Sequence, residues 1–284
     1  MGGVMSSHVL HRTVRLFPQA LLCAAFLALP FASAHTATPN KATDDKSASS
    51  AISIPPGTIL PVRLNPAISS ASARPGQAIT GRIMQDVPLP AGMKIQKGSE
   101  VIGHVIDVTP ATAGAGARVS LEFDKLVSAH QTISIATNLR AIAGFMRVIE
   151  AQTPKFGAGE GEVFRWLTTV QIGGDVVYGE GGPVVSGDGT NKTVGKAVNG
   201  GVLSQVRTKE GTMCWGAIDG IDTPQALWVF SSDACGAYGL EHISIAHSGP
   251  TDPTAIIVLA SDSGELKIRS GAGMLLRVNA TGHK

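Results

Sequence analysis

Short apolar segments bounded by turn residues run through most of this chain and constrain its fold more than any other feature. They are rich in β-branched residues and partly alternate between apolar and polar side chains, and the chain has 34 Gly and 16 Pro among 284 residues. Strands of this length and spacing predict an all-β fold, either a sandwich or a barrel. One stretch, residues 139–153, also allows a short helix, although Gly144 argues against it. The segments are TILPVRL (58–64), AITGRI (78–83), VIGHVIDV (101–108), RVSLEF (118–123), TISIATNL (132–139), TTVQIG (168–173), ALWVFS (226–231), AIIVLA (255–260), ELKIR (265–269) and MLLRV (274–278).

Two stretches near the ends of this region resemble each other. IPPGTILPVRLN (54–65) and IRSGAGMLLRVN (268–279) align without gaps, with Ile, Gly, Arg and Asn at the same four places. In the first, Pro at the second turn position and Gly at the fourth predict a type I turn ahead of a strand. The alternative is that any β protein repeats its turn chemistry. If the two stretches are equivalent, the C-terminal strand returns to the N-terminal part and closes one sheet or barrel.

The N-terminus has the three parts of a secretory signal peptide. Two arginines precede an apolar run over residues 16–31, and the small-residue tripeptide ASA closes it. This pattern predicts cleavage after Ala34 and export to a periplasmic or extracellular location. The alternative is an uncleaved membrane anchor, but the run is shorter than the roughly 20 residues of a membrane span. No other stretch is long and apolar enough, so we expect no transmembrane span after signal removal.

These observations divide the chain into five parts. The polar residues after the signal read as a flexible linker, because they offer few bulky side chains for a core. The scheme is a signal peptide (1–34), a linker (35–52), a β-barrel-like domain (53–145), a Gly-rich β insertion with a disulfide (146–255) and C-terminal strands that close the first domain (256–284).

Charge excludes one class of partner. The chain has 23 Lys+Arg and 21 Asp+Glu, and the signal peptide holds two arginines and no acidic residue, so the mature chain has 23 − 2 = 21 positive and 21 negative side chains. A neutral surface gives no electrostatic reason to bind nucleic acid.

Export makes the cysteines informative. Once the signal is removed, only Cys214 and Cys235 remain. Two thiols in an oxidising compartment predict a disulfide, with two free buried thiols as the alternative. Neither redox spacing nor zinc-ligand spacing is present, and we expect no metal or cofactor.

The stretch YGEGGPVVSGD (178–188) is similar to the nucleophile loop of secreted serine proteases. However, no Ser occupies the slot between the acidic residue and the glycines, and Ser186 comes after the proline. A serine protease also needs a His base within hydrogen-bond reach. The glycines instead predict a hairpin between residues 176–178 and 183–185, with positive φ in the turn.

Other polar stretches of the sequence favour loops over ligand-binding sites. GTNKTVGKA (189–197) lacks the spacing and the Ser or Thr of a phosphate-binding loop, and we expect a surface loop there. The residues with metal-ligand chemistry are Glu241, His242, His247, Asp252, Asp219, Asp222 and Asp233. They lack the geometry of a metal or calcium site, because His242 and His247 fall on opposite faces of a strand and the aspartates lack calcium-loop order.

Aromatic side chains gather around the two cysteines. Trp215, Trp228, Phe230 and Tyr238 lie in this part of a chain that has only 13 aromatic residues. Trp215, Trp228 and Tyr238 are therefore candidates for contact with a protein partner or a glycan. The alternative, which we favour, is a local core beneath the disulfide.

Several turn-and-strand motifs carry a resemblance to a known family. They are IPPGTILPVRL (54–64), DV (86–87) ahead of LPAG (89–92), IQKGSEVIGHV (95–105) and RVSLEFDKL (118–126). Over residues 53–140, with a closing strand at 264–279, this series resembles the C-terminal β-barrel domain of the scaffold protein of bacterial type IV secretion and conjugation machines. The resemblance implies a barrel, a cell-envelope location and ring-like assembly as a homo-oligomer. The chain departs from that family in its cleaved signal, its lack of a long proline-rich stretch and its insertion near 150–255.

The sequence thus predicts a non-catalytic exported scaffold or interaction protein of the cell envelope, with an envelope protein or a surface glycan as partner. A secreted glycan-binding module that uses the aromatics of the Cys214–Cys235 loop is the alternative. A hydrolase with an unfamiliar site is a third reading. Exposure of the aromatic rings separates the first two, because buried rings favour a scaffold and exposed rings favour a glycan.

Overall fold

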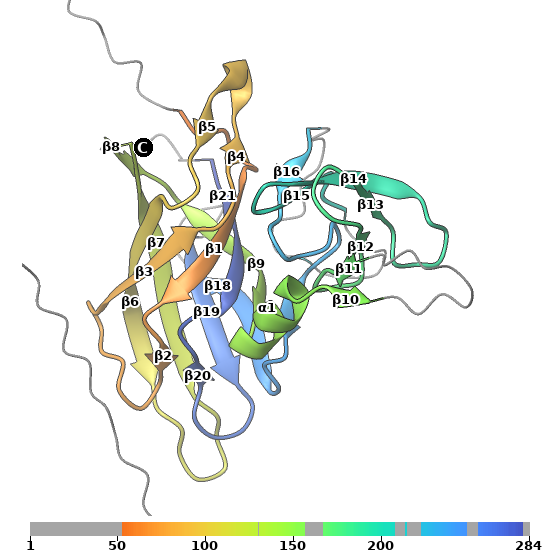
Figure 1. Cartoon of the computed structure of the whole chain (residues 1–284). Coiled ribbons are helices and arrows are strands. Elements are labelled where there is room, and N and C mark those ends of the chain that lie inside the picture. Colours follow the sequence, from red (N-terminus) through yellow and green to blue (C-terminus); the bar gives the residue numbers. More distant parts are fainter. Residues whose placement is uncertain are drawn as a thin grey trace, which may run out of the picture. The chain divides into compact units, whose positions relative to one another are not determined.

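The computed structural model describes residues 53–129, 131–156, 167–207, 214, 223–248 and 255–280 (Figure 1). These residues belong to one compact unit, Ser50–Lys284. They form strands with one short α-helix, which confirms the all-β prediction. The predicted signal peptide and linker lie outside the described residues. None of the helices described there is long and apolar enough to cross a membrane.

A ten-stranded, nearly closed barrel-like sheet is the larger of the two main sheets. Its order is β17-β9-β21-β1-β3-β6-β7-β19-β18, with β8 paired to β7. The strands are β1 Ile59–Asn65, β3 Ala78–Ile83, β6 Glu100–Thr109, β7 Arg118–Ser128, β8 Gln131–Ser134, β9 Thr137–Ala143, β17 Gly236–Tyr238, β18 Ile243–Ser248, β19 Ile256–Ser261 and β21 Gly273–Val278. Two further sheets have two strands each, β2 (Ile68–Ser69) with β20 (Lys267–Ile268), which are far apart in sequence, and β4 (Val87–Pro88) with β5 (Lys94–Ile95).

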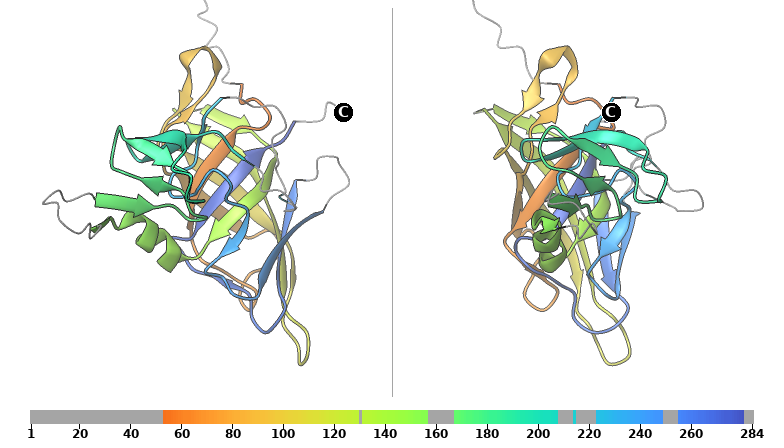
Figure 2. Two further views of the ribbon diagram at one scale, coloured as in Figure 1. Left: turned by 90° about the vertical axis from the view of Figure 1, so that its right-hand side faces the viewer. Right: turned by 45° about the vertical axis from the view of Figure 1, so that its right-hand side comes forward.

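The C-terminal strand lies beside the N-terminal one. β21 pairs antiparallel with β1, with Ile59 opposite Arg277 and Arg63 opposite Gly273. On its other side β21 pairs with β9. Segments far apart in sequence are therefore neighbours in the sheet, as the different views show (Figure 2).

The two similar stretches each begin with the same turn, but its register differs from the prediction. The N–H of Thr58 donates to the carbonyl of Pro55, and that of Ala272 donates to Arg269. Glycine therefore occupies the third turn position, with φ of +88° at Gly57 and +88° at Gly271. A positive φ at the third position defines a type II turn rather than the expected type I, and it requires glycine.

The insertion begins with a helix and continues as a meander. α1 (Phe145–Gln152) follows β9 directly, so residues 139–153 are a strand and a helix, and Gly144 lies at the helix N-cap. The seven-stranded sheet that follows runs in sequence order through β10 Lys155–Phe156, β11 Leu167–Val170, β12 Val176–Val177, β13 Pro183–Val185, β14 Thr193–Val198, β15 Gly201–Ser204 and β16 Gln225–Ala226. The surface loop expected over 189–197 is therefore wrong from Thr193 onward, where the apolar residues pair with β13 and β15.

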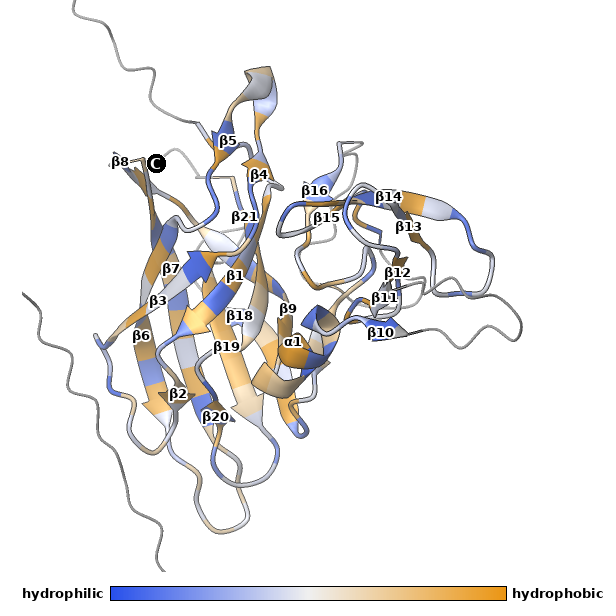
Figure 3. Cartoon of the chain, viewed as in Figure 1, coloured by the Kyte–Doolittle hydropathy of each residue, from blue (hydrophilic) through white to orange (hydrophobic). Residues whose placement is uncertain are grey.

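Three neighbouring barrel strands are buried on both faces. One face of β1, β21 and β9 carries Leu60 and Leu276 into the barrel core. The other face carries Ile59 and Leu275 into a second core, together with Phe230 from the insertion. Complete burial of such a side chain contributes about 1.5–3 kcal/mol. The insertion therefore covers one face of the barrel, so these strands carry buried apolar residues on both faces. Figure 3 gives the hydropathy along the strands.

Two buried glutamines fasten the insertion to the barrel. Gln85, which follows β3, donates from Nε2 to the carbonyl of Val202 at 2.7 Å and accepts the N–H of Trp228 at 2.8 Å. Gln225 of β16 accepts the backbone N–H of Ile59 at 3.1 Å. These amides pair the backbone N–H groups of Trp228 and Ile59, which the packing of the two sheets would otherwise leave unpaired. The carbonyl of Val202 also accepts the N–H of Leu227.

Candidate functional site

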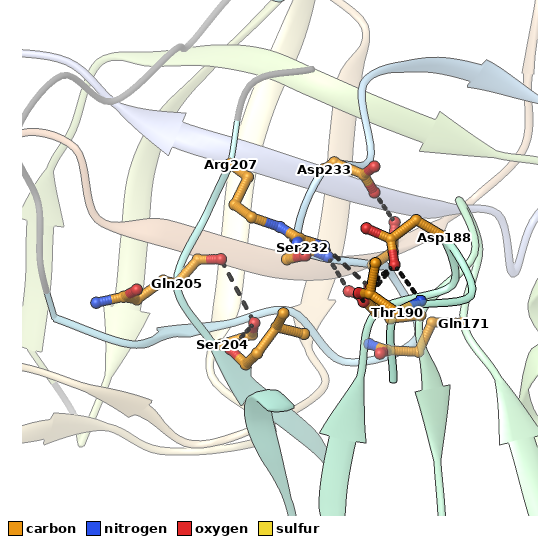
Figure 4. Close-up of polar contacts among 12 residues, drawn as sticks. Gln171, Asp188, Thr190, Ser204, Gln205, Arg207, Ser232 and Asp233 are labelled. Carbon is orange, nitrogen blue, oxygen red and sulfur yellow. Dashed lines mark hydrogen bonds and ion pairs between the residues drawn. The ribbon is translucent and has the colours of Figure 1, made fainter. Parts of the chain in front are cut away.

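A polar cavity of about 360 Å³ opens in the insertion (Figure 4). It is lined by residues 173–175 and 186–188, together with Arg207 and Asp233. These residues come from the turn between β11 and β12, the loop after β13, the segment after β15 and the loop before β17. No sequence motif links four such segments, so the sequence did not reveal the cavity.

An ion pair between a buried aspartate and a partly exposed arginine organises one side of the cavity. Asp175 is 2% exposed, and its Oδ1 accepts a 3.1 Å bond from Nη2 of Arg207. Its Oδ2 accepts the backbone N–H of Ser232 at 2.6 Å, and Nε of Arg207 donates to Oγ of the same serine at 2.9 Å. The charge of Asp175 is therefore matched by an arginine, as a buried carboxylate requires.

The loop after β13 fixes a second carboxylate. Asp188 Oδ1 accepts hydrogen bonds from the hydroxyl of Ser186 at 2.6 Å and from the N–H and hydroxyl of Thr190. These bonds, first of all the one from Ser186, hold the pKa of Asp188 well below its ordinary value. Ser186 thus donates to a carboxylate, whereas the nucleophile of a serine protease donates to a histidine.

The protease-like stretch thus has a structural explanation. β12 and β13 form the predicted antiparallel hairpin. Gly179 and Gly181 have φ of +80° and +78°, as predicted for the turn. Ser186 and Asp188, at the end of the stretch, line the polar cavity instead of forming a nucleophile loop.

Close backbone approaches shape the cavity wall. A Cβ atom on Gly187 would come within 1.6 Å of the carbonyl oxygen of Gly174. On Gly173, where φ is +110°, it would come within 2.1 Å of Oγ of Ser231. Only glycine allows the loops to meet at this distance.

A buried arginine of the barrel is hydrogen-bonded to the backbone of Arg207, which lines the cavity. Arg140 of β9 is 2% exposed, and its Nη2 donates to the carbonyl of Arg207 at 2.5 Å. Burial lowers the pKa of Arg140 to about 10, while Tyr238 and Asp233 act in the opposite direction. The side chain remains a cation at neutral pH and ties the cavity to the barrel.

The predicted disulfide joins Cys214 to Cys235, with 5.6 Å between their Cα atoms. The N–H of Cys235 donates to the hydroxyl of Tyr238 at 3.0 Å. Tyr238 is half-buried, Trp228 is only 4% exposed and Phe230 is fully buried. Trp215 lies outside the described residues. The ring of Trp228 therefore belongs to the second core and has no exposed face for a sugar.

A larger and mostly apolar cavity, of about 1030 Å³, lies where the barrel meets the insertion. Thr58 and Gln225 contribute to its lining, and Lys196 is its charged residue. Prolines form much of its wall, namely Pro55, Pro56, Pro88, Pro90 and Pro224. We call it the proline-lined cavity. The sequence did not reveal it either, because its walls come from segments more than 100 residues apart.

Three of the residues with metal-ligand chemistry make other contacts, and a fourth, Glu241, is exposed. His242 pairs with Asp262 at 3.0 Å, and His247 accepts the N–H of Leu139. Asp233 accepts the hydroxyl of Ser231, whereas Asp219, Asp222 and Asp252 lie outside the described residues. On the barrel, His104, Glu122 and Asp124 gather on β6 and β7, where His104 and Glu122 form a 3.2 Å cross-strand pair.

No family model, no curated protein and no solved structure matches this chain. The chemistry of the cavities must therefore indicate what they do. In the polar cavity Arg207 balances Asp175, while Asp188 and Asp233 add two negative charges beside several hydroxyl groups. These groups can hydrogen-bond a hydroxyl-rich molecule or pair with a cationic one.

Proposed function

We propose that the chain is a non-catalytic, exported scaffold or interaction protein of the cell envelope. One observation carries the proposal: the insertion and the barrel share a core on the outer face of β1, β21 and β9. Such packing makes the insertion a fixed part of the barrel surface. A rigid surface of this kind suits a protein that holds a partner in place.

Further features support this reading over the alternatives. The resemblance to the type IV secretion scaffold implies a barrel that assembles in the envelope. The Cys214–Cys235 disulfide is typical of an oxidising compartment. Ser186 is hydrogen-bonded to a weakly basic carboxylate, which speaks against a hydrolase that uses this serine.

A glycan-binding module is the second candidate, and the polar cavity is the observation that favours it. Carboxylates and an arginine are the groups that commonly hydrogen-bond sugar hydroxyls, and Asp188 and Asp233 are both available there. Because Trp228 is buried, we expect a sugar to bind in this cavity and not at Trp228.

An affinity-purification experiment tests the proposal. The tagged chain is expressed with its signal, and N-terminal sequencing should show that the exported protein begins at His35. Cross-linking in envelope extracts should then capture an envelope protein that also binds the purified chain directly, and sedimentation should report any ring-like homo-oligomer. An unprocessed N-terminus would contradict export, and failure to find a direct protein partner would contradict the scaffold.

A glycan array separates the second candidate from the first. If the chain is a glycan-binding module, it binds specific sugars, and Asp188→Asn or Asp233→Asn abolishes that binding. Asp107→Asn, an exposed change on β6 of the barrel, is the matched control. Sugar binding that all three variants retain would contradict a role of the polar cavity.

A further inference from the structure

We infer that the proline-lined cavity is the docking site for an extended partner segment that carries an aromatic or large apolar side chain beside a carboxylate. The inference rests on the interaction function proposed above and names the partner's chemistry. Three walls form the cavity: the N-terminal segment with Pro55 and Pro56, the β4–β5 hairpin with Pro88, and strands β14 to β16 of the insertion.

The size of the cavity suits a short stretch of polypeptide. Small-molecule pockets commonly enclose about 300–1,000 Å³. A volume of about 1030 Å³ lies just above that range and can hold several residues of an extended chain. The cavity has nearly three times the volume of the polar cavity in the insertion.

The composition of the walls selects the occupant's side chains. Five of the lining residues are prolines, which have a fixed φ and no N–H to offer. An added β-strand would therefore find few backbone donors along them, and side-chain contacts must provide the affinity. Proline surfaces and aromatic rings are complementary in protein recognition. The apolar side chains of Leu89 and Leu203 extend the same surface.

The positive charge of Lys196 indicates that the partner segment carries a carboxylate. Lys196 is the charged side chain among the lining residues, and it is exposed. Its backbone pairs with both β13 and β15 in the sheet, which leaves its ammonium group as its means of recognition. Within the described part of the chain, no salt bridge to Lys196 is present. A cation beside an apolar wall attracts an anionic group on the partner.

The cavity is held open by the contacts that join the two sheets. Gln225 lines the cavity and accepts the N–H of Ile59, so the wall from β16 is fastened to β1. Gln85 fixes the segment between β3 and β4 to Val202 and Trp228. A pre-formed site needs little ordering when a partner binds, which favours affinity.

Peptide titration tests the inference. The probes are three labelled, end-blocked tripeptides with the sequences Glu-Trp-Leu, Lys-Trp-Leu and Glu-Ser-Ser, and fluorescence anisotropy reports their binding to the full chain. We expect the first to bind more than fivefold more tightly than the other two. Lys196→Glu and Pro88→Asp should each weaken it at least fivefold. The matched controls Lys192→Glu and Pro110→Asp change exposed residues outside the cavity and should leave binding unchanged.

Three outcomes would overturn the inference. The first is that no peptide binds, or that all three bind alike. The second is that the cavity variants bind the first peptide as the wild type does. The third is that sedimentation shows a wild-type oligomer which Pro88→Asp dissociates, because the occupant would then be a second copy of the chain. If an envelope protein binds the cavity variants as well as the wild type, the proposed function stands and the docking site falls.

Discussion

The backbone N–H of Leu139 donates a 2.9 Å hydrogen bond to Nε2 of His247. Leu139 lies on β9, which pairs with β21 on one side and with the short end strand β17 on the other. His247 lies on β18, the strand at the opposite end of the sheet, which pairs with β19. An imidazole therefore spans the seam at which the two ends of the barrel-like sheet approach each other. The bond requires an unprotonated Nε2, and burial lowers the pKa of His247 to about 4 from 6.5.

This seam predicts a loss of stability in mild acid. Because the folded pKa lies below the unfolded one, the unfolded chain binds the proton first. The contribution is complete above about pH 6.5 and is lost as the pH falls towards 4. We expect about 1–2 kcal/mol, reduced for a partly exposed ring. Urea unfolding at several pH values should show that His247→Gln removes this loss. His242→Gln, on an exposed ring, is the control, and an equal acid loss in His247→Gln would contradict the prediction.

Replacement of Arg140 should destabilise the whole unit. Arg140→Leu leaves the carbonyl of Arg207 without its 2.5 Å donor and removes the cation that faces Asp233 and Tyr238. Loss of one partner from a buried charged network costs about 3–5 kcal/mol. Arg82→Leu, on an exposed side chain of β3, should change the free energy of unfolding by less than about 0.5 kcal/mol. Similar losses in the two variants would show that Arg140 has no special role.

Gln85 should matter more than its polarity suggests. Gln85→Leu keeps the volume but leaves the N–H of Trp228 unpaired inside the protein. The carbonyl of Val202 loses the Gln85 donor but still accepts the N–H of Leu227. We expect a loss of about 1–3 kcal/mol, the cost of one buried unsatisfied group. Chemical denaturation measures the loss, with the exposed Gln96→Leu as control. A variant as stable as the wild type would mean that water or movement satisfies the N–H of Trp228.

The barrel should not fold without its C-terminus. Deletion of residues 264–284 removes β21 and leaves β1 and β9 without the strand between them. We expect aggregation or loss of the thermal transition. A fragment of residues 53–145 should likewise show no sharp transition in calorimetry. A sharp transition in that fragment would show that the first part is independent of β21.

Features of the fold that depend on neighbouring residues could be predicted from the sequence, whereas features that depend on distant residues could not. The all-β class and the hairpin at residues 178–188 follow from strand and turn chemistry within short windows. The Cys214–Cys235 bond follows from counting. The turn type at Pro55 was misjudged because an IPPG string fits two registers, and only the hydrogen bond from Thr58 decides between them.

The two cavities could not be predicted from local sequence patterns. Asp175, Asp188 and Asp233 look like ordinary turn residues, and their convergence depends on the packing of the insertion. The prolines of the proline-lined cavity come together around one space only because β16 lies beside β4. Trp228 was a candidate contact on the basis of its neighbours in sequence, whereas its burial depends on the barrel face beneath it.

The pairing of β1 with β21 also determines when the barrel can close during synthesis. β1 is among the first strands to be made, and its partner follows roughly 200 residues later. At roughly 5–20 residues per second, the ribosome needs on the order of 10–40 s to provide it. Throughout that interval β1 has β3 on one side but lacks β21 on the other, so the barrel can close only when synthesis is almost complete. An unpaired strand edge favours aggregation in the meantime.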